Sequence, residues 1–349
     1  MPREAYSPCV LVDTADLPEA EWLEWRRKGI GGSDAAAIFG ISPFATARDL
    51  YYDKVGILPC EETDENWVQK QVGHLLEDLV AQIFAKKTGF KIYQVKKMFH
   101  HPKHTFMLAD VDYFVELPDG TTAILEIKTT NYNARDHWWR DGQEVVPVNY
   151  ETQGRHYMCV MNVDQVFYCC LYGNSFEEVI IRSLKRDYDY EDELIMVEED
   201  FWVNNVLKKV EPPYTEDGEL ILESIRRHFG DVDTDAPTVT LSLPLASCVL
   251  RFTELQAQKK AADAEATRLK KEMERLQGMV LAEMGKSSSA ECTIGAEKFT
   301  VTYKPSSRPA IGKEGLLRLQ VRHPDIYKEY VTPVVSHRFN VKKSLEEAA

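Results

Sequence analysis

Residues Phe106 to Thr130 read FMLADVDYFVELPDGTTAILEIKTT, and their pattern is the strongest indication of the fold. Two apolar, strand-like runs flank Leu-Pro-Asp-Gly, a turn in which Pro presets φ and Gly supplies a positive φ. We therefore predict a β-hairpin whose first strand covers about 106–116 and whose second strand ends near Thr129. With the turn centred on Asp119, this register places Asp112 opposite Glu126.

The predicted hairpin carries an unusual set of charges on one face. Asp112 and Glu126 are two carboxylates in directly opposed positions, where like charges repel and destabilise a sheet. Lys128 lies two residues after Glu126, so it shares the same face. Two interpretations stay open at this point. The face is either exposed to solvent with a Glu–Lys pair, or it is a metal site whose carboxylates are held together by a cation.

Composition limits the class of protein. The chain has 349 residues and a net charge of −14, which argues against non-specific coating of nucleic acid but does not exclude a nuclease. The residues from Arg251 onward are the basic part, with 18 Lys and Arg against 13 Asp and Glu. No run is apolar enough to span a membrane, no signal peptide is evident, and the seven cysteines form no C-x-x-C pair. We expect a cytoplasmic protein with no membrane partner.

A glycine-rich turn near the N-terminus has the chemistry of a phosphate-binding site. A predicted helix over 17–27 ends in Arg26-Arg27, and Gly29-Ile-Gly-Gly-Ser33-Asp34 then leads into an Ala-rich helix. Backbone N–H groups at a helix N-terminus, a hydroxyl and a guanidinium together suit a phosphate. The simpler interpretation, an inter-helix turn with a good cap, also stays open.

Two further predicted helices carry polar residues of interest. The helix over about 66–88 has an apolar stripe with Glu77 beside it, where a glutamate is either a rim residue or part of a site. The helix over 147–162 places Gln153 and Tyr157 on one face, because they are four residues apart. Strands are predicted over 165–172 and 179–184.

Composition also predicts how the chain is divided. We expect a first domain over 1–215, a linker over 216–250 and a C-terminal appendage over 251–349. The appendage begins with a long amphipathic helix over 252–284, for which a sustained coiled coil is one option, and continues with a small β-containing segment.

The motifs occur in a recognisable order, which is Trp22-x3-Arg26-x3-Ile-Gly-Gly-Ser33-Asp34, Gly73-x3-Glu77, Asp112, Glu126-Ile-Lys128 and Gln153-x3-Tyr157. This set resembles the YqaJ viral recombinase family of phage lambda exonuclease-like proteins. The resemblance implies an α/β (α+β) fold with a PD-(D/E)xK restriction-endonuclease-like core. In that core a central mixed sheet is flanked by helices.

The resemblance also implies a metal site. Asp112, Glu126 and the backbone carbonyl of Ile127 correspond to ligands of Mg²⁺, with Mn²⁺ as a substitute, and Glu77 corresponds to a glutamate near the metal. Lys128 corresponds to the lysine that activates the attacking water. Hard oxygen ligands are those that Mg²⁺ prefers.

Other site residues follow from the same resemblance. Gln153 and Tyr157 correspond to a helix that lines the catalytic site, and Arg26 and Ser33 to a pocket for the 5′-phosphate end of DNA. One residue departs from the pattern, because Asp110 stands where the family has a serine. A carboxylate there either replaces the hydroxyl contact or repels a phosphate.

The function implied is a Mg²⁺-dependent 5′-to-3′ double-strand DNA exonuclease that leaves 3′ single-stranded overhangs for phage-type homologous recombination. The alternatives are an endonuclease with the same core, acting in defence or repair, and a non-catalytic DNA-binding protein. Implied partners are double-stranded DNA, a single-strand annealing protein and further copies of the chain in a homo-oligomer, with a ring as one form.

Overall fold

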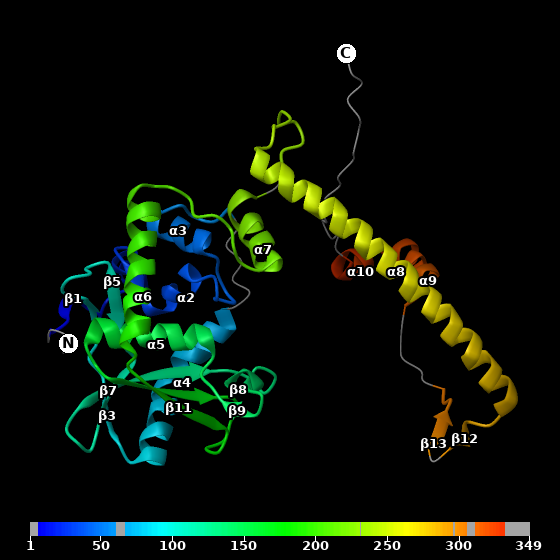
Figure 1. Ribbon diagram of the computed structural model, residues 1–349, viewed down its shortest axis with the longest axis horizontal. Helices are drawn as coiled ribbons and strands as arrows, with labels where there is room; N and C mark the ends of the chain where they lie inside the picture. Colours follow the sequence, from blue (N-terminus) through cyan, green and yellow to red (C-terminus); the bar gives the residue numbers. More distant parts are fainter. Residues whose placement is uncertain (1–5, 61–66, 231, 296, 306–310, 332–349) are drawn as a thin grey trace. The chain divides into compact units, whose positions relative to one another are not determined.

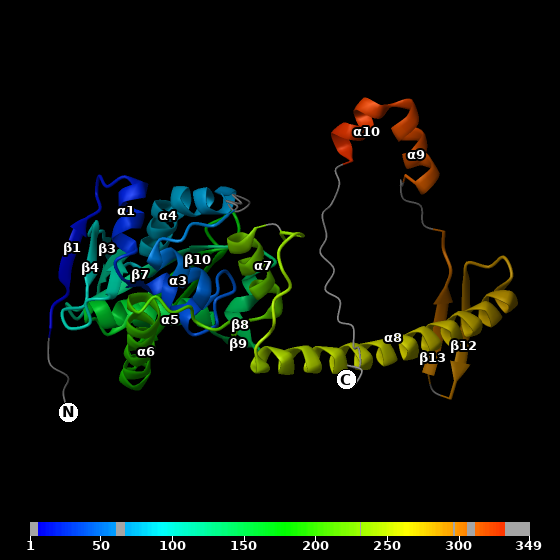
Figure 2. The same cartoon turned by 90° about the horizontal axis from the view of Figure 1, so that it is seen from above.

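The structure is a computed structural model that describes residues 6–60, 67–230, 232–295, 297–305 and 311–331. The chain divides into two compact units, residues 1–234 and 235–349. The division falls inside the predicted linker, whose residues include helix α7 (Gly218–Phe229) and the start of α8 (Leu243–Met284). Figure 1 shows the elements of both units, and Figure 2 shows them from above.

The first unit contains two main sheets. The smaller sheet has the strand order β1-β4-β5-β2, in which β2 is parallel to β5 and the other pairs are antiparallel. Its strands are β1 (Cys9–Asp13), β4 (Lys97–His100), β5 (Met107–Asp110) and β2 (Ile30–Gly31). The larger sheet has the order β11-β10-β7-β6-β3, in which only the β7–β10 pair is parallel. Its strands are β11 (Val179–Lys185), β10 (Gln165–Leu171), β7 (Thr122–Thr129), β6 (Tyr113–Glu116) and β3 (Lys91–Tyr93).

Helices cover both sheets, as the fold class predicted from the sequence requires. The helices of this unit are α1 (Glu19–Arg26), α2 (Gly32–Ile38), α3 (Ala47–Val55), α4 (Trp67–Thr88), α5 (Val148–Met161), α6 (Tyr188–Asp200) and α7. A 3₁₀ turn (Arg135–Trp138) and the short pair β8 (Trp139–Arg140) and β9 (Gln143–Glu144) lie between β7 and α5, and a π-helical turn (Phe201–Leu207) extends α6. The mixed α/β architecture is confirmed.

Strand β7 is buried on both faces, and the alternation of its side chains decides where the site forms. Leu125 and Ile127 belong to the core cluster that includes Val80 and Phe84 of α4. Ile124 belongs instead to the cluster that includes residues of α5. Since successive side chains of a strand point to opposite faces, Glu126 and Lys128 face α5. Figure 2 shows β7 and β10 between the two helices.

The hairpin register is confirmed, but its first strand is not continuous. Tyr113 pairs with Leu125 and Glu116 with Thr122, as a turn centred on Asp119 requires. The predicted strand over 106–116 is nevertheless two strands, because β5 pairs with β4 in the smaller sheet and β6 pairs with β7 in the larger one. The chain therefore leaves one sheet and enters the other at Val111 and Asp112.

The second unit contains the long helix α8 and smaller elements. Strands β12 (Ser289–Ile294) and β13 (Glu297–Thr302) form an antiparallel pair, and helices α9 (Lys313–Arg322) and α10 (Pro324–Tyr330) follow. The predicted helix over 252–284 is confirmed and begins earlier, at Leu243. Pro244 occupies the first turn of this helix, where its missing N–H costs nothing.

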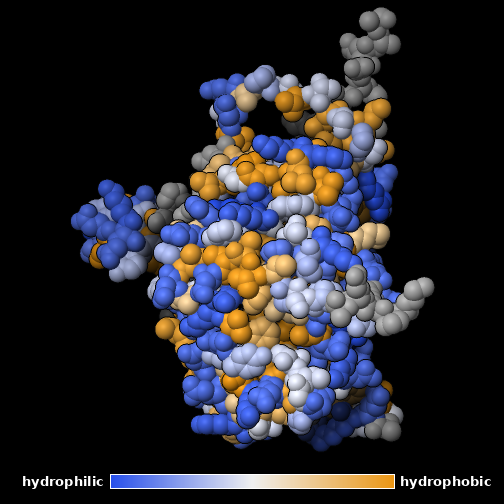
Figure 3. Space-filling model, turned by 90° about the vertical axis from the view of Figure 1, so that its left-hand side faces the viewer, coloured by the Kyte–Doolittle hydropathy of each residue, from blue (hydrophilic) through white to orange (hydrophobic). Residues whose placement is uncertain are grey.

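The surface mixes polar and apolar side chains. In the face shown in Figure 3, hydrophobic patches lie between hydrophilic ones. Scattered exposed apolar side chains are normal for folded proteins. Within the described ranges, no helix has the length and apolar composition needed to cross a membrane.

Candidate active site

The site is built around Asp112, at the point where the chain passes between the two sheets. The backbone N–H of Ile127 donates a hydrogen bond to Asp112 Oδ2 at 2.8 Å. The neighbouring Glu126 is 2% exposed. The break after β5 therefore brings the two predicted carboxylates to the same end of the hairpin, and a backbone hydrogen bond holds the first of them.

Lys128 and Gln153 fix the position of Glu126. Lys128 Nζ lies 2.7 Å from Glu126 Oε1 and 3.1 Å from Gln153 Oε1. Gln153, on α5, donates from its amide nitrogen to the same Glu126 oxygen. The ring of Tyr150 lies 4.9 Å from Lys128 Nζ, a cation–π distance. The structure therefore brings together the predicted Glu126, Lys128 and Gln153.

The electrostatics of this group show an excess of negative charge. Burial raises the pKa of Asp112 well above its ordinary value, and Glu126 and Glu77 raise it further. Burial also raises the pKa of Glu77. For Lys128 burial acts to lower the pKa, but Glu126 and Asp112 outweigh it, so the pKa is raised and the amine stays charged. One lysine does not neutralise three carboxylates, and a bound cation would stabilise the ionised forms.

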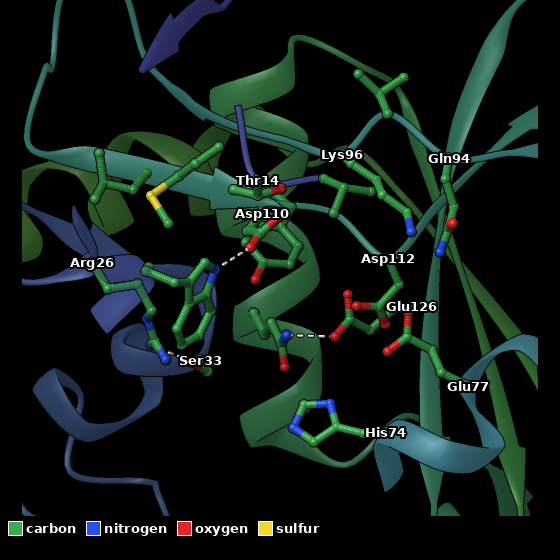
Figure 4. Close-up of a pocket in the computed structure, with 18 of the residues that line it drawn as sticks. Thr14, Arg26, Ser33, His74, Glu77, Gln94, Lys96, Asp110, Asp112 and Glu126 are labelled. Atoms are coloured by element: carbon green, nitrogen blue, oxygen red, sulfur yellow. Dashed lines mark hydrogen bonds between the residues drawn. The ribbon is translucent and has the colours of Figure 1, made fainter. Parts of the chain in front are cut away.

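The residues fit a divalent cation by their chemistry. Within the described residues Glu126 Oε2 is buried and has no hydrogen-bond partner. In Figure 4 the carboxylates of Asp112, Glu126 and Glu77 lie near one another. Across the described ranges, no three His, Cys, Asp or Glu side chains stand grouped as a metal site. A cation bound here would therefore draw these carboxylates closer together.

The predicted phosphate pocket lies beside α5 because two glycines permit a close approach. A Cβ on Gly32 would lie 2.6 Å from Tyr157 Cε1, so only glycine lets the start of α2 pack on this ring. A Cβ on Gly29 would lie 2.4 Å from the carbonyl oxygen of Phe106, beside the β2–β5 pairing. The glycine-rich turn is thus needed to bring Ser33 and Arg26 to the site.

Asp34 holds this pocket together. Arg26 Nη2 donates to Ser33 Oγ at 2.8 Å and to Asp34 Oδ1 at 2.6 Å. Lys54 Nζ contacts Asp34 Oδ2 at 2.8 Å, and the N–H of Gly31 donates to the same oxygen at 3.0 Å. In the sequence, Asp34 stands at the end of the glycine-rich turn, with no predicted role in the site. Its ion pairs with Arg26 and Lys54 make it the anchor of the pocket.

Most of the predicted site residues line one cavity of about 450 Å³. Arg26, Ser33, Glu77, Asp112, Glu126, Gln153 and Tyr157 line it, and Lys128 lies behind them in contact with Glu126 and Gln153. The structure places Ile127 beside Asp112 through its N–H, while the predicted role of its carbonyl stays a prediction.

Several cavity residues were missed from the sequence. Figure 4 shows them around the same space, and they are Thr14, His74, Gln94 and Lys96. His74 was detectable in principle, because it lies three residues before Glu77 and shares its helix face. Gln94 and Lys96 follow β3, and no pattern in the sequence connects that strand to the hairpin.

Comparisons with known proteins show what this chain is similar to. Residues 21–164 match the model of the YqaJ-like viral recombinase domain. This part of the chain is similar to that domain. This match agrees with the resemblance found from the motifs, because the matched residues include all five motifs from Trp22 to Tyr157. Over 338 residues the chain is 27% identical to the protein YqaJ of Bacillus subtilis (strain 168), covering 96% of this chain and 97% of that protein.

Solved structures with some likeness include an alkaline exonuclease (LHK-Exo) from Laribacter hongkongensis, with 17% identity and a TM-score of 0.44 over 60% of this chain and 99% of that one. The same protein in complex with dAMP gives 18% identity and a TM-score of 0.45, over 55% and 94% of the two chains. A phage related exonuclease from Haemophilus somnus 129PT gives 15% identity and a TM-score of 0.37, over 52% and 96%.

Asp110, the residue that departs from the pattern of the similar family, has its own partner. Trp22 Nε1 donates to Asp110 Oδ2 at 2.7 Å. Burial raises the pKa of Asp110, whereas Trp22 and Arg26 act to lower it. Asp110 lines the cavity, and Figure 4 shows it between Arg26 and Ser33 on one side and Asp112 on the other. A carboxylate therefore lies within the cavity that the substrate would enter.

The Asp34 anchor gives the stability of the first unit a measurable dependence on pH. Burial acts to raise the pKa of Asp34, but Arg26 and Lys54 outweigh it and hold the pKa at about 2. Because this pKa is lower than in the unfolded chain, the ionised carboxylate contributes about 2 kcal/mol above pH 4, and this contribution is lost as the pH falls toward 2. We expect the destabilisation caused by Asp34→Asn to shrink by about 1 kcal/mol between pH 6 and pH 3.

Urea unfolding of the wild type and of Asp34→Asn at both pH values measures this difference. Asp136→Asn, at an exposed carboxylate, is the control and should change little at either pH. An Asp34→Asn effect of equal size at pH 6 and pH 3 would show that the carboxylate is not held ionised by its cations.

Proposed function

We propose that the first unit is a metal-dependent deoxyribonuclease that degrades double-stranded DNA from its 5′ end. The observation that carries this proposal is the single cavity in which Asp112 and Glu126 lie opposite a pocket formed by Arg26 and Ser33. The YqaJ-like viral recombinase domain supports it, because the matched region holds these residues. The positive charge of Arg26 at one end of the cavity suits the terminal phosphate of a DNA strand. The carboxylates at the other end suit hydrolysis of a neighbouring phosphodiester bond.

In this proposal Asp112, Glu126, Glu77 and the carbonyl of Ile127 would hold Mg²⁺, for which Mn²⁺ would substitute. Mg²⁺ takes oxygen ligands and keeps several waters, so a few carboxylates suffice. When bound, the ion supplies Lewis acidity toward the phosphate and lowers the pKa of a water.

The protein's own groups have separate tasks. Lys128, kept charged by Glu126, would place a positive charge beside the scissile phosphate and orient the attacking water. Gln153 keeps Lys128 and Glu126 in position through its amide. Tyr157 forms the wall between the catalytic group and the glycine-rich turn, so it would set the distance between the bound end and the bond to be cut.

Arg26 and Ser33 would bind the terminal 5′-phosphate. The guanidinium carries a charge that Asp34 helps to maintain, since Asp34 raises the pKa of Arg26. A guanidinium next to a hydroxyl and the start of a helix suits a phosphate group. Degradation from a 5′ end leaves 3′ single strands, the substrates of strand annealing in recombination. We propose a single-strand annealing protein as a partner, self-association of the nuclease, and a cytoplasmic site of action in a bacterial or phage-infected cell.

Digestion of three forms of one plasmid tests this proposal. With Mg²⁺ we expect linear duplex to be degraded progressively and covalently closed circles to stay intact, and a 5′-phosphate should increase the rate at linear ends. Nicked circles show whether an internal 5′ end is accepted. Cutting of closed circles would favour the endonuclease alternative, and intact DNA in every sample would remove the nuclease proposal.

A further inference from the structure

Beyond the end of β7, aromatic rings and guanidinium groups from three segments of the first unit lie in a continuous row. The rings of Tyr132 and Tyr172 meet edge to face, with their centroids 5.4 Å apart. Arg135 Cζ lies 5.6 Å from the centroid of Tyr172 and 5.9 Å from that of Trp139. Arg182 Cζ lies 5.0 Å from the Trp139 centroid. These are cation–π distances, and we call the five side chains the arginine–aromatic ladder.

One end of the ladder is buried and the other is open to solvent. The side chain of Arg182 is only 12% exposed, and Trp139 and Tyr172 are half-buried. At the open end, Tyr132 is 56% exposed and the side chain of Arg135 is 42% exposed. The buried end therefore supports the rings from the protein side, while the open end presents one aromatic ring and one guanidinium to a ligand.

Hydrogen bonds hold the loop that carries the open end. The side-chain oxygen of Asn131 accepts hydrogen bonds from the N–H groups of Asn133 and Ala134, at 2.9 and 3.1 Å. Trp138, in the 3₁₀ turn between Arg135 and β8, is 2% exposed and packs on Tyr150 with ring centroids 5.9 Å apart. A loop that is already ordered loses little conformational freedom when it binds a ligand.

The ladder begins next to the candidate active site. The N–H of Thr130 donates to the carbonyl oxygen of Leu171 at 2.8 Å, so the parallel strands β7 and β10 end side by side. Lys128 lies on β7 only two residues before Thr130, and the ladder continues from the ends of both strands. In open α/β sheets ligands bind outside the carboxyl ends of parallel strands, which is where the ladder lies.

The chemistry of the open end fits single-stranded nucleic acid. An unpaired base offers a π face to an exposed aromatic ring, and an arginine can hold the adjoining phosphate. In a duplex these faces are already stacked on neighbouring bases. Arg135 and Arg182 have acidic partners, Asp136 at 3.2 Å and Glu144 at 3.3 Å. Both acids are mostly exposed, and because exposed ion pairs contribute about 1 kcal/mol or less, a phosphate can replace them.

We propose that the arginine–aromatic ladder is a binding site for single-stranded DNA, in which Tyr132 stacks on an unpaired base and Arg135 contacts the adjoining phosphate. It holds unpaired DNA beside the group formed by Lys128, Glu126 and Gln153. That this DNA is a strand of the nuclease substrate rests on the proposed function, whereas the binding itself does not.

Fluorescence anisotropy of a labelled oligothymidylate tests the binding, with full-length protein in EDTA. Tyr132→Ala should weaken the affinity by about 5-fold or more, the lower end of the loss for one stacked base. Tyr132→Phe keeps the ring and should bind like the wild type. Phe44→Ala is a second control, because Phe44 is an aromatic side chain outside the ladder with 67% exposure, and it should also keep the wild-type affinity.

An oligonucleotide of the same length, with abasic residues in place of the thymidines, separates stacking from charge. The wild type should bind the abasic strand more weakly than oligothymidylate, and Tyr132→Ala should remove most of this difference. Arg135→Ala should weaken the binding of both strands, because both keep their phosphates. The proposal is overturned if Tyr132→Ala binds oligothymidylate like the wild type, or if it loses equal affinity for both strands.

This assay contains no divalent cation and measures no cleavage, so its outcome is separate from that of the plasmid digestion. Binding that depends on Tyr132, in a protein that leaves every form of the plasmid intact, would support the ladder and remove the nuclease proposal. Digestion of linear DNA by a protein whose binding of oligothymidylate does not depend on Tyr132 would remove the ladder and leave the nuclease proposal standing.

Discussion

Glu126→Gln is expected to lower the rate of duplex digestion by at least about 100-fold, the scale of losing one electrostatic contact to the transition state. The substitution keeps the size of the side chain and one carbonyl oxygen. That oxygen can still accept hydrogen bonds from Lys128 and Gln153, as Glu126 Oε1 does. What disappears is the negative charge and the second oxygen, which is buried without a hydrogen-bond partner among the described residues.

Loss of the carboxylate acts on two parts of the proposed chemistry. An amide is a poorer ligand for a hard divalent cation than a carboxylate. In addition, Glu126 is a cause of the raised pKa of Lys128, so the lysine would hold its proton less firmly in the variant. Both effects reduce the positive charge available beside the scissile phosphate.

The measurement is the initial rate of nucleotide release from linear duplex with Mg²⁺, together with the thermal unfolding of each protein. Glu116→Gln is the matched control, because Glu116 lies on the same hairpin, is exposed and pairs with Lys91 at 3.5 Å. It should keep the wild-type rate. A folded Glu126→Gln variant with wild-type activity would exclude this carboxylate from catalysis.

The hairpin shows how far local sequence determines this structure. The Leu-Pro-Asp-Gly turn fixes the register of β6 and β7, so the opposition of Asp112 and Glu126 follows from neighbouring residues alone. The break between β5 and β6 does not follow from them, because Met107 to Asp110 is as strand-like as Tyr113 to Glu116. The choice of sheet is made by β4, a partner that the turn does not specify.

The contacts that complete the site are those between distant segments. Trp22 and Asp110 are joined by an indole hydrogen bond across 88 positions of the chain. Lys54 reaches Asp34 from another helix, and its charge adds to that of Arg26 in keeping the buried carboxylate ionised. No periodicity or spacing contains such a pairing. The family resemblance predicted a different kind of residue, those that belong to motifs occurring in a fixed order along the chain.

Helix α7 illustrates the same limit outside the site. Its Ser224 is buried and donates to Asp49 of α3 at 2.8 Å, and His228 approaches the same carboxylate at 3.0 Å. The segment looked like a linker because prolines precede it and polar residues follow it. Its packing on α3 depends on a buried aspartate more than 170 positions earlier, which the segment's own composition does not show.

Arg26→Ala and Asp110→Asn are expected to shift the preference for 5′-phosphorylated ends in opposite directions. Arg26 is the pocket's guanidinium and contacts Ser33 directly. Without it, the ratio of rates on 5′-phosphoryl and 5′-hydroxyl ends should fall by about 10-fold or more, the scale of losing one charge-assisted contact.

Asp110→Asn removes a negative charge from the same cavity, while Trp22 can still donate to the amide oxygen. This variant should raise the ratio, because a phosphate dianion no longer meets a carboxylate.

Digestion rates are measured on linear duplexes that differ only in carrying a 5′-phosphate or a 5′-hydroxyl. A change in the hydrolysis step affects both rates equally and therefore cancels in their ratio. Arg27→Ala is the control, since the adjacent arginine pairs with Asp53 at 3.0 Å and does not line the cavity. It should leave the ratio unchanged. If Arg26→Ala keeps the wild-type ratio, the pocket does not bind the end phosphate. If only Asp110→Asn leaves it unchanged, Trp22 already holds the Asp110 carboxylate away from the DNA, and the departure at this position has no effect on which ends are accepted.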